Sequence, residues 1–244
     1  MRIKIINPNT TELMTAGIHE TALRVARPGT EIVTVNPLTG PSSIEGYFDG
    51  QLAVIGVMEE VLRSAKGEKI DAFILACFGD PGLEALRELT DIPVVGIAEA
   101  AIFLSCFLAP KFSVITVIPR VVVPMEQIVR KYGVSERLAS VRATKLSVLD
   151  FVEDLERGKR ALIQEGRLAV EEDGAEVLLL GCAGMAGLDG EMEKEVGVPV
   201  IDGVAAAVKI AEGLVDLNKR TSKVRTYARP EKKPISGFPP IFCE

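Results

Sequence analysis

The sequence predicts an α/β protein made of two similar Rossmann-like halves with parallel sheets, related by a pseudo-two-fold axis, with the active site in the cleft between them. Short apolar, β-branched runs alternate with longer amphipathic stretches, a pattern typical of βαβ units. Several short runs are continuously hydrophobic, as expected of strands that helices cover on both faces. A long segment of the chain also recurs at a spacing of a little over 100 residues.

The elements follow from this alternation in order along the chain. The predicted strands are residues 3–6, 32–35, 72–76, 93–95, 113–117, 177–180 and 199–201. The predicted helices are residues 12–26, 51–65, 82–89, 121–132, 152–172 and 204–217. We assign residues 1–103 together with 204–244 to the first half, and residues 104–203 to the second.

The internal repeat is the most informative feature of the sequence. Residues 72–83, AFILACFGDPGL, match residues 177–188, VLLLGCAGMAGL. Each copy contains a buried strand, a small residue, a cysteine, a glycine two positions later and a Gly-Leu pair. Each is followed by a strand that proline opens, in DIPVVGIAEAA (91–101) and GVPVIDGVAAA (197–207). A duplicated half of this kind packs about a two-fold axis, so matched positions face each other.

The repeat places Cys77 and Cys182 at the carboxyl ends of matched strands. Ligands of open α/β sheets bind at these strand ends. The two thiols are therefore predicted to face one cleft from opposite sides. A buried free cysteine on its own usually only packs, but the matched positions of this pair favour catalysis. Cys106 lies in an apolar stretch, where packing explains it. Cys243 lies beside the C-terminus, and we assign it no function.

Two opposed thiols can invert a stereocentre without a cofactor. One removes a proton from one face of the substrate, and the other donates a proton to the opposite face. Each cysteine precedes a glycine-containing turn, at Gly79 and at Gly184, and then a helix. Backbone N–H groups and the helix dipole are expected to lower the pKa of each thiol toward neutrality and to hold an enolate oxygen.

Other residues at the same strand ends are candidate substrate contacts. Asn9 follows the first strand, in KIINPNTT (4–11), and Thr116 takes the corresponding position in the weaker echo SVITVIPR (113–120). Their alternative role is in turns and helix caps. The loop at residues 41–49 is a candidate lid over the cleft.

Composition narrows the classes of partner. The net charge of −6 argues against nucleic acid, and no stretch approaches the roughly 20 apolar residues that span a bilayer. Nucleotide-binding glycine motifs and a Ser-His-Asp pattern are absent from the sequence, and its single histidine, His19, falls in the first predicted helix. Free cysteines without an export signal suggest the cytoplasm. We expect a homo-oligomer, and a solvated or oligomer-contacting basic tail from residue 218 onward.

The motifs INPNTT, PSSIEGYFD, CFGDPGL, VVGIAEAA, TVIPR, LGCAGM and PVIDGVAAAVK together resemble the hydantoin and allantoin racemases of the aspartate/glutamate racemase superfamily. The resemblance covers residues 2–217. It implies a two-cysteine mechanism, with no metal and no cofactor, on a small-molecule substrate. One departure is visible, because Val117 stands where the resemblance leads us to expect a second threonine. The implied substrate contacts are Asn9, Ser43, Gly79, Thr116 and Gly184, to which we add the adjoining Phe78, Val117 and Ala183.

We therefore predict racemisation of 5-substituted hydantoins or of allantoin. One alternative is racemisation of aspartate or another amino acid, or a related decarboxylation or isomerisation on the same scaffold. A further alternative is a two-lobed protein that binds a small molecule without catalysis, which the fold alone does not exclude.

Overall fold

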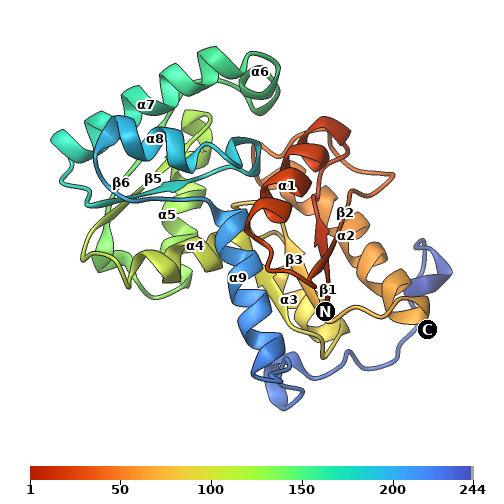
Figure 1. Ribbon diagram of the computed structural model, residues 1–244. Coiled ribbons are helices and arrows are strands. Elements are labelled where there is room, and N and C mark those ends of the chain that lie inside the picture. The colour runs from red at the N-terminus through yellow and green to blue at the C-terminus, as the bar shows by residue number, and fades with distance from the viewer. Residues whose placement is uncertain (243–244) are drawn as a thin grey trace.

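The computed structural model describes residues 1–242, and Figure 1 shows them as two α/β halves side by side. Within the described residues each half holds a four-stranded, all-parallel sheet. The first sheet has the order β2 (Glu31–Val35), β1 (Arg2–Ile6), β3 (Ala72–Leu75) and β4 (Val94–Gly96). The second has the order β6 (Leu138–Ala143), β5 (Phe112–Thr116), β7 (Val177–Leu180) and β8 (Val200–Ile201). The matching strand orders confirm the predicted fold class.

Helices connect the strands as parallel crossovers require. The helices of the first half are α1 (Glu12–Val25), α2 (Tyr47–Gly67) and α3 (Leu83–Leu89), and α4 (Ile97–Ser105) leads to the second sheet. The second half contains α5 (Val122–Lys131), α6 (Val148–Glu153), α7 (Leu155–Glu171) and α8 (Asp189–Val196), after which α9 (Gly203–Asp216) returns to the first sheet. No helix among residues 1–242 is long and apolar enough to cross a membrane.

Helices α4 and α9 join the two halves. Helix α9 follows the last strand of the second sheet but packs on β3 and β4 of the first. Helix α4 follows β4 but contacts β7 and β8, and the two helices pack on each other. The predicted boundary at residue 103 falls inside α4. Each half thus contributes one helix to the core of the other.

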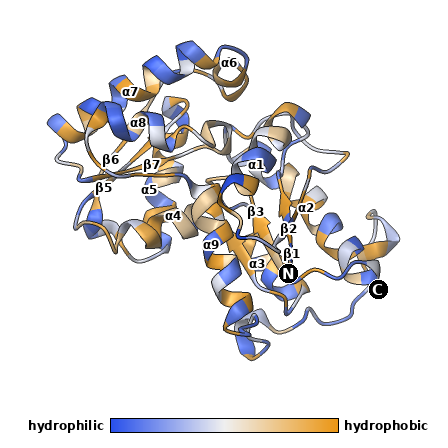
Figure 2. Ribbon diagram, in the orientation of Figure 1, coloured by the Kyte–Doolittle hydropathy of each residue, from blue (hydrophilic) through white to orange (hydrophobic). Residues whose placement is uncertain are grey.

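Buried strands and inward helix faces form the core, as the apolar strands in Figure 2 illustrate. The main cluster spans both halves and includes Ile5, Ile74, Val114 and Leu179. A second cluster packs α2 against the opposite face of the first sheet, around Val57 and Leu75. Because one cluster spans both sheets, the geometry of the cleft between them is fixed by apolar packing.

Several expectations about the fold differ from the structure. Strand β6 was not predicted, because its residues are all half-buried and form no continuous apolar run. Residues 47–49 of the predicted lid loop belong to the first turn of α2. The basic tail does not extend into solvent throughout, since the Lys223 ammonium donates to the carbonyls of Arg87 and Glu88 at the end of α3. Cys243 lies outside the described residues.

Candidate active site

A cavity of about 200 Å³ lies where the carboxyl ends of both sheets meet. Its volume is below the roughly 300–1,000 Å³ of sites for drug-sized ligands, which suits a small substrate. None of the described residues that line it is charged. They are Asn9, Met14, Ile44, Gly46, Tyr47, Gly50, Gln51, Ala76, Cys77, Phe78, Gly79, Pro81, Thr116, Val117, Val121, Pro124, Met125, Val148, Gly181, Cys182 and Ala183.

Cys77 and Cys182 line this cavity from different sheets. Each lies two residues beyond a buried central strand, β3 for Cys77 and β7 for Cys182. The continuous apolar sequences of these strands bury them on both faces, and the glycine-rich turn that follows each strand leaves the thiol at the sheet edge. Both cysteines are free thiols and partly accessible.

Burial raises the pKa of both thiols. The pKa of Cys77 rises to about 12 and that of Cys182 to about 11, with loss of solvation as the main cause in each case. Backbone N–H groups act in the opposite direction, from Gly79 for Cys77 and from Gly184, whose nitrogen lies 3.3 Å from the Cys182 sulfur. The sequence-based expectation of a lowered pKa was therefore right about the donors and wrong about the net result.

Asn9 enters the cavity from the loop after β1 and is buried. Its side-chain oxygen accepts hydrogen bonds from the Asn7 amide at 3.0 Å and from the Thr11 backbone N–H at 2.9 Å. Its side-chain N–H group contacts the Met14 sulfur at 3.4 Å, and a thioether is a weak acceptor. This arrangement fixes the orientation of the amide and leaves its N–H group able to donate to a carbonyl oxygen.

Thr116, at the end of β5, lines the cavity from the second half. The residue is 1% exposed, and its hydroxyl has no hydrogen-bond partner among the described residues. A buried hydroxyl without a partner costs roughly 1–3 kcal/mol. A polar substrate atom in the cavity would satisfy this group.

The remaining predicted contacts divide into two groups. Phe78, Gly79, Val117 and Ala183 line the cavity with the cysteines. Ser43 and Gly184 are not among its lining residues. The Gly184 N–H group nevertheless donates a hydrogen bond to the sulfur of Cys182, which does line the cavity.

Part of the cavity wall comes from α2, α5 and α6, and its residues were not predicted as substrate contacts. Tyr47 lines the cavity, and its hydroxyl donates to the Gln127 side chain of α5 at 2.6 Å. Glu45 accepts a hydrogen bond from the backbone N–H of Val148 at the start of α6, at 2.8 Å. These two contacts join residues 44–47 to the second half. The aromatic residues of GYFD, within the predicted lid, were the available signal.

Other candidate residues lie away from the cavity. His19 hydrogen-bonds the Thr34 hydroxyl on β2 at 3.0 Å, and the Cys106 thiol donates to the Ile102 carbonyl within α4. The described residues contain no group of three or more His, Cys, Asp or Glu side chains that could hold a metal ion.

A family model and known relatives match most of the chain. The family model described as Asp/Glu/Hydantoin racemase matches residues 3–211. A hydantoin racemase from Pseudomonas sp. (strain NS671) is 54% identical over 237 residues, which cover 97% of this chain and 95% of the relative.

Two solved structures are similar over nearly their whole length. An allantoin racemase from Klebsiella pneumoniae superposes with a TM-score of 0.94 at 43% identity, covering 97% of this chain and 96% of that one. An allantoin racemase from Pseudomonas fluorescens gives a TM-score of 0.93 at 47% identity, covering 97% and 100%. Matched sheets, paired cysteines and these similarities lead to one conclusion: the chain belongs to the Asp/Glu/hydantoin racemase family and is an isomerase of the racemase type.

Proposed function

We propose that this protein racemises 5-substituted hydantoins, with Cys77 and Cys182 as alternating base and acid. One observation carries the proposal: two free thiols line a cavity, and none of its described lining residues is charged. A free amino acid would need charged partners for its carboxylate and ammonium groups, because buried charges are costly unless paired. A hydantoin ring is neutral and needs none.

The proton balance of the proposed reaction closes without a cofactor. The thiolate of one cysteine takes the proton from C5 and becomes a thiol, and the C5–H electron pair passes into an enolate on the adjacent carbonyl. The thiol of the other cysteine protonates C5 from the opposite face and becomes a thiolate. The product is the mirror-image hydantoin, and the two cysteines have exchanged protonation states, ready for the reverse reaction.

Neutral donors are available for the developing enolate. The buried Asn9 amide and the unpartnered Thr116 hydroxyl line the same cavity as the two thiols. Hydrogen bonds placed where charge develops stabilise the transition state more than the ground state. We therefore assign Asn9 and Thr116 as substrate contacts.

Allantoin is the second candidate substrate, since the two similar solved structures are described as allantoin racemases. Its ring is a hydantoin, but its C5 substituent is a polar ureido group. The cavity wall offers apolar side chains at Met14, Val121, Met125 and Val148. This composition favours an apolar C5 substituent.

Polarimetry combined with solvent deuterium incorporation at C5 tests the function. The substrates are benzylhydantoin, isopropylhydantoin, allantoin and aspartate. We expect the first two to racemise fastest and aspartate to remain unchanged. Racemisation of aspartate but not of the hydantoins would exclude the proposed substrate class.

Cysteine variants test the mechanism. Cys77→Ser and Cys182→Ser should each lower the rate by roughly 10²–10⁴-fold, the usual contribution of a positioned acid or base. Cys106→Ser is the matched control, because Cys106 does not line the cavity. Near-normal rates in either active-site variant would rule out the two-thiol mechanism.

A further inference from the structure

The feature that the reaction does not use is a buried carboxylate in the Cys77 loop. Asp80 is 2% exposed, and its backbone N–H donates to the Cys77 carbonyl at 2.9 Å. Its side chain accepts hydrogen bonds from the backbone N–H groups of Ala98 at 3.2 Å and Glu99 at 2.9 Å, at the start of α4. The hydroxyl of Tyr132, from the second half, donates to it at 2.6 Å. The carboxylate is thus held in place from two directions.

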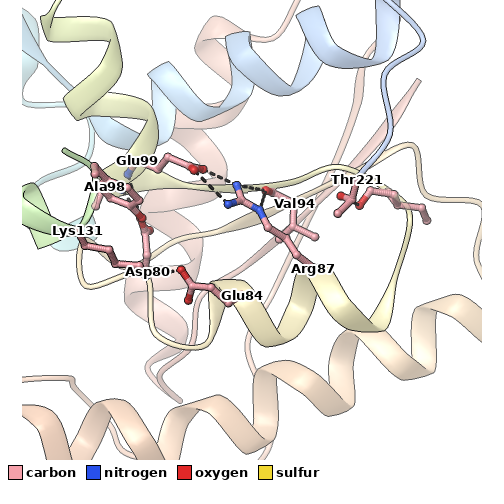
Figure 3. Close-up of polar contacts among 10 residues, drawn as sticks. Asp80, Glu84, Arg87, Val94, Ala98, Glu99, Lys131 and Thr221 are labelled. Atoms are coloured by element: carbon pink, nitrogen blue, oxygen red, sulfur yellow. Dashed lines mark hydrogen bonds and ion pairs between the residues drawn. The ribbon is translucent and has the colours of Figure 1, made fainter. Parts of the chain in front are cut away.

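The charge of Asp80 has no cation to neutralise it among residues 1–242. The neighbouring carboxylates are different: Glu99 pairs with Arg87, and Glu84 on α3 pairs with Lys131 (Figure 3). The groups that face Asp80 are therefore Cys77 on its own loop, Tyr132 at the end of α5, and these two ion pairs. A buried, unpaired negative charge acts strongly on nearby ionisable groups, since little solvent screens it.

The loop of the second cysteine has no carboxylate of its own, and the buried Asp202 contacts it at the Gly187 N–H group, five residues beyond Cys182. The position that corresponds to Asp80 is Met185, which is buried and apolar. Glu45 is the carboxylate that acts on Cys182, but it is half-buried, near solvent, and its oxygen accepts from the Val148 N–H group. Solvent screens a half-exposed charge more than a buried one. The two thiols therefore sit in unequal electrostatic environments.

We propose that Asp80 is a positioning residue that disfavours the thiolate of Cys77, so that in the substrate-free enzyme Cys182 ionises more readily than Cys77. This inference rests on the proposed function for its catalytic meaning. Loss of solvation is the main cause of the raised pKa of Cys77, and the charges of Cys182 and Asp80 raise it further, whereas the charge that acts on Cys182 is that of the half-buried Glu45. The Cys182 side of the cavity is then favoured to take the first proton before substrate binds.

Competitive alkylation tests this proposal without any substrate. The full-length protein is treated with iodoacetamide at pH 8, and the modification rates of Cys77, Cys182 and Cys106 are measured by peptide mass spectrometry. Thiolates react and thiols do not. In the wild-type protein we expect Cys182 to be modified faster than Cys77. Equal rates, or faster modification of Cys77, would overturn the assignment.

Asp80→Asn removes the charge and keeps the shape. The ratio of Cys77 to Cys182 modification should rise by roughly three- to tenfold, the effect of about half to one pKa unit. Asp202→Asn is the matched control, because Asp202 is also a buried carboxylate that accepts three backbone hydrogen bonds. It should leave the ratio within about twofold. An unchanged ratio in Asp80→Asn would contradict the proposal.

A second variant covers the case in which Asp80→Asn folds poorly. Tyr132→Phe removes the donor that stabilises the ionised Asp80, so Asp80 holds its proton more often and the ratio should rise by a smaller factor. The modification rate of Cys106 serves as an internal reference, because general loosening would raise it too. Racemase assays of the cysteine variants test the two-cysteine mechanism, and alkylation tests the role of Asp80. Failure of one proposal can therefore be distinguished from failure of the other.

Discussion

In the first half of the molecule Asp80 caps α4 from the cysteine loop, whereas in the second half Asp202 caps α9 from the end of β8. The repeat aligns Asp80 with Met185, and Asp202 with Gly96. The two carboxylates have therefore exchanged places between the two ends of the same structural unit. Each still connects a cysteine loop to a crossing helix, since Asp202 also accepts from the Gly187 N–H group at 2.6 Å.

Both halves need an acceptor for the N–H groups at the start of a helix, but they place the aspartate that supplies it at different positions. The first residues of α4 and α9 are largely buried, so their N–H groups need an acceptor, because unsatisfied buried donors are costly. Either end of the unit can supply that acceptor. The electrostatic results differ, because Asp80 acts on its neighbouring thiol, whereas the charge that raises the pKa of Cys182 comes from Glu45.

The raised pKa that both thiols share should have the largest effect, on the pH dependence of the rate. Burial raises the pKa of both thiols to about 11–12, so the thiolate fraction increases about tenfold for each pH unit between pH 7 and pH 9. The rate of deuterium incorporation at C5, corrected for uncatalysed exchange, should rise by up to about a hundredfold over this range. A plateau below pH 8 would show that one thiol is far more acidic than burial allows.

The second largest effect is expected from a larger side chain at Gly96, which should lower stability. A Cβ atom at this position would overlap the Asp80 carboxylate, so Gly96→Ala displaces the cap of α4. We expect a loss of roughly 1–3 kcal/mol in the free energy of unfolding, measured with urea. Gly190→Ala is the control, because nothing lies near its Cβ position in α8, and it should be neutral or stabilising by up to about 1 kcal/mol. Equal effects would remove the steric argument.

Moving the carboxylate tests whether the two arrangements are interchangeable. Asp80→Gly leaves buried donors unsatisfied and should cost roughly 1–3 kcal/mol of unfolding free energy. Gly is compatible with the positive φ of 41° at this position. Adding Gly96→Asp should restore about 1 kcal/mol or more, because the introduced carboxylate can then cap α4 as Asp202 caps α9. Strict additivity of the two single changes in urea unfolding would indicate that the positions are not equivalent.

The smallest effect concerns Thr116 in the second half, whose hydroxyl has no hydrogen-bond partner in the part of the chain that the structure describes. Thr116→Val removes a buried hydroxyl that has no hydrogen-bond partner among the described residues, so the free energy of unfolding should rise by about 1 kcal/mol, the lower end of the cost of such a group. The value of kcat/KM should fall by roughly three- to tenfold, as loss of one neutral hydrogen bond predicts. Ser113→Ala is the contrast, because Ser113 hydrogen-bonds Ser140 at 2.8 Å and its loss should lower stability instead. Unchanged kcat/KM in Thr116→Val would exclude this contact.

Much of the fold was predictable from short stretches of sequence. The central strands and most helices lie within a few residues of their expected positions, because continuous apolar runs and helical periodicity are local signals. Strand β6 gave no such signal, since an edge strand with half-buried residues needs no continuous apolar run. The crossing of α4 and α9 was equally hidden, because it depends on which sheet each helix covers.

Some residues of the candidate site could be predicted from the sequence, and others could not. Both cysteines and Thr116 came from the internal repeat, which is a property of the sequence alone. The walls contributed by Tyr47, Met125 and Val148 did not, because α2, α5 and α6 reach the cavity only through tertiary packing.

The sequence by itself determined the duplicated α/β architecture and the matched positions of Cys77 and Cys182, because both follow from patterns within short segments. Only the tertiary structure decided how acidic those thiols are and what surrounds them. Burial depends on every element packed around the cavity, and Tyr132 meets Asp80 across 52 positions of the chain. Loss of solvation and unscreened charge are properties of that assembly, so no local pattern could reveal them.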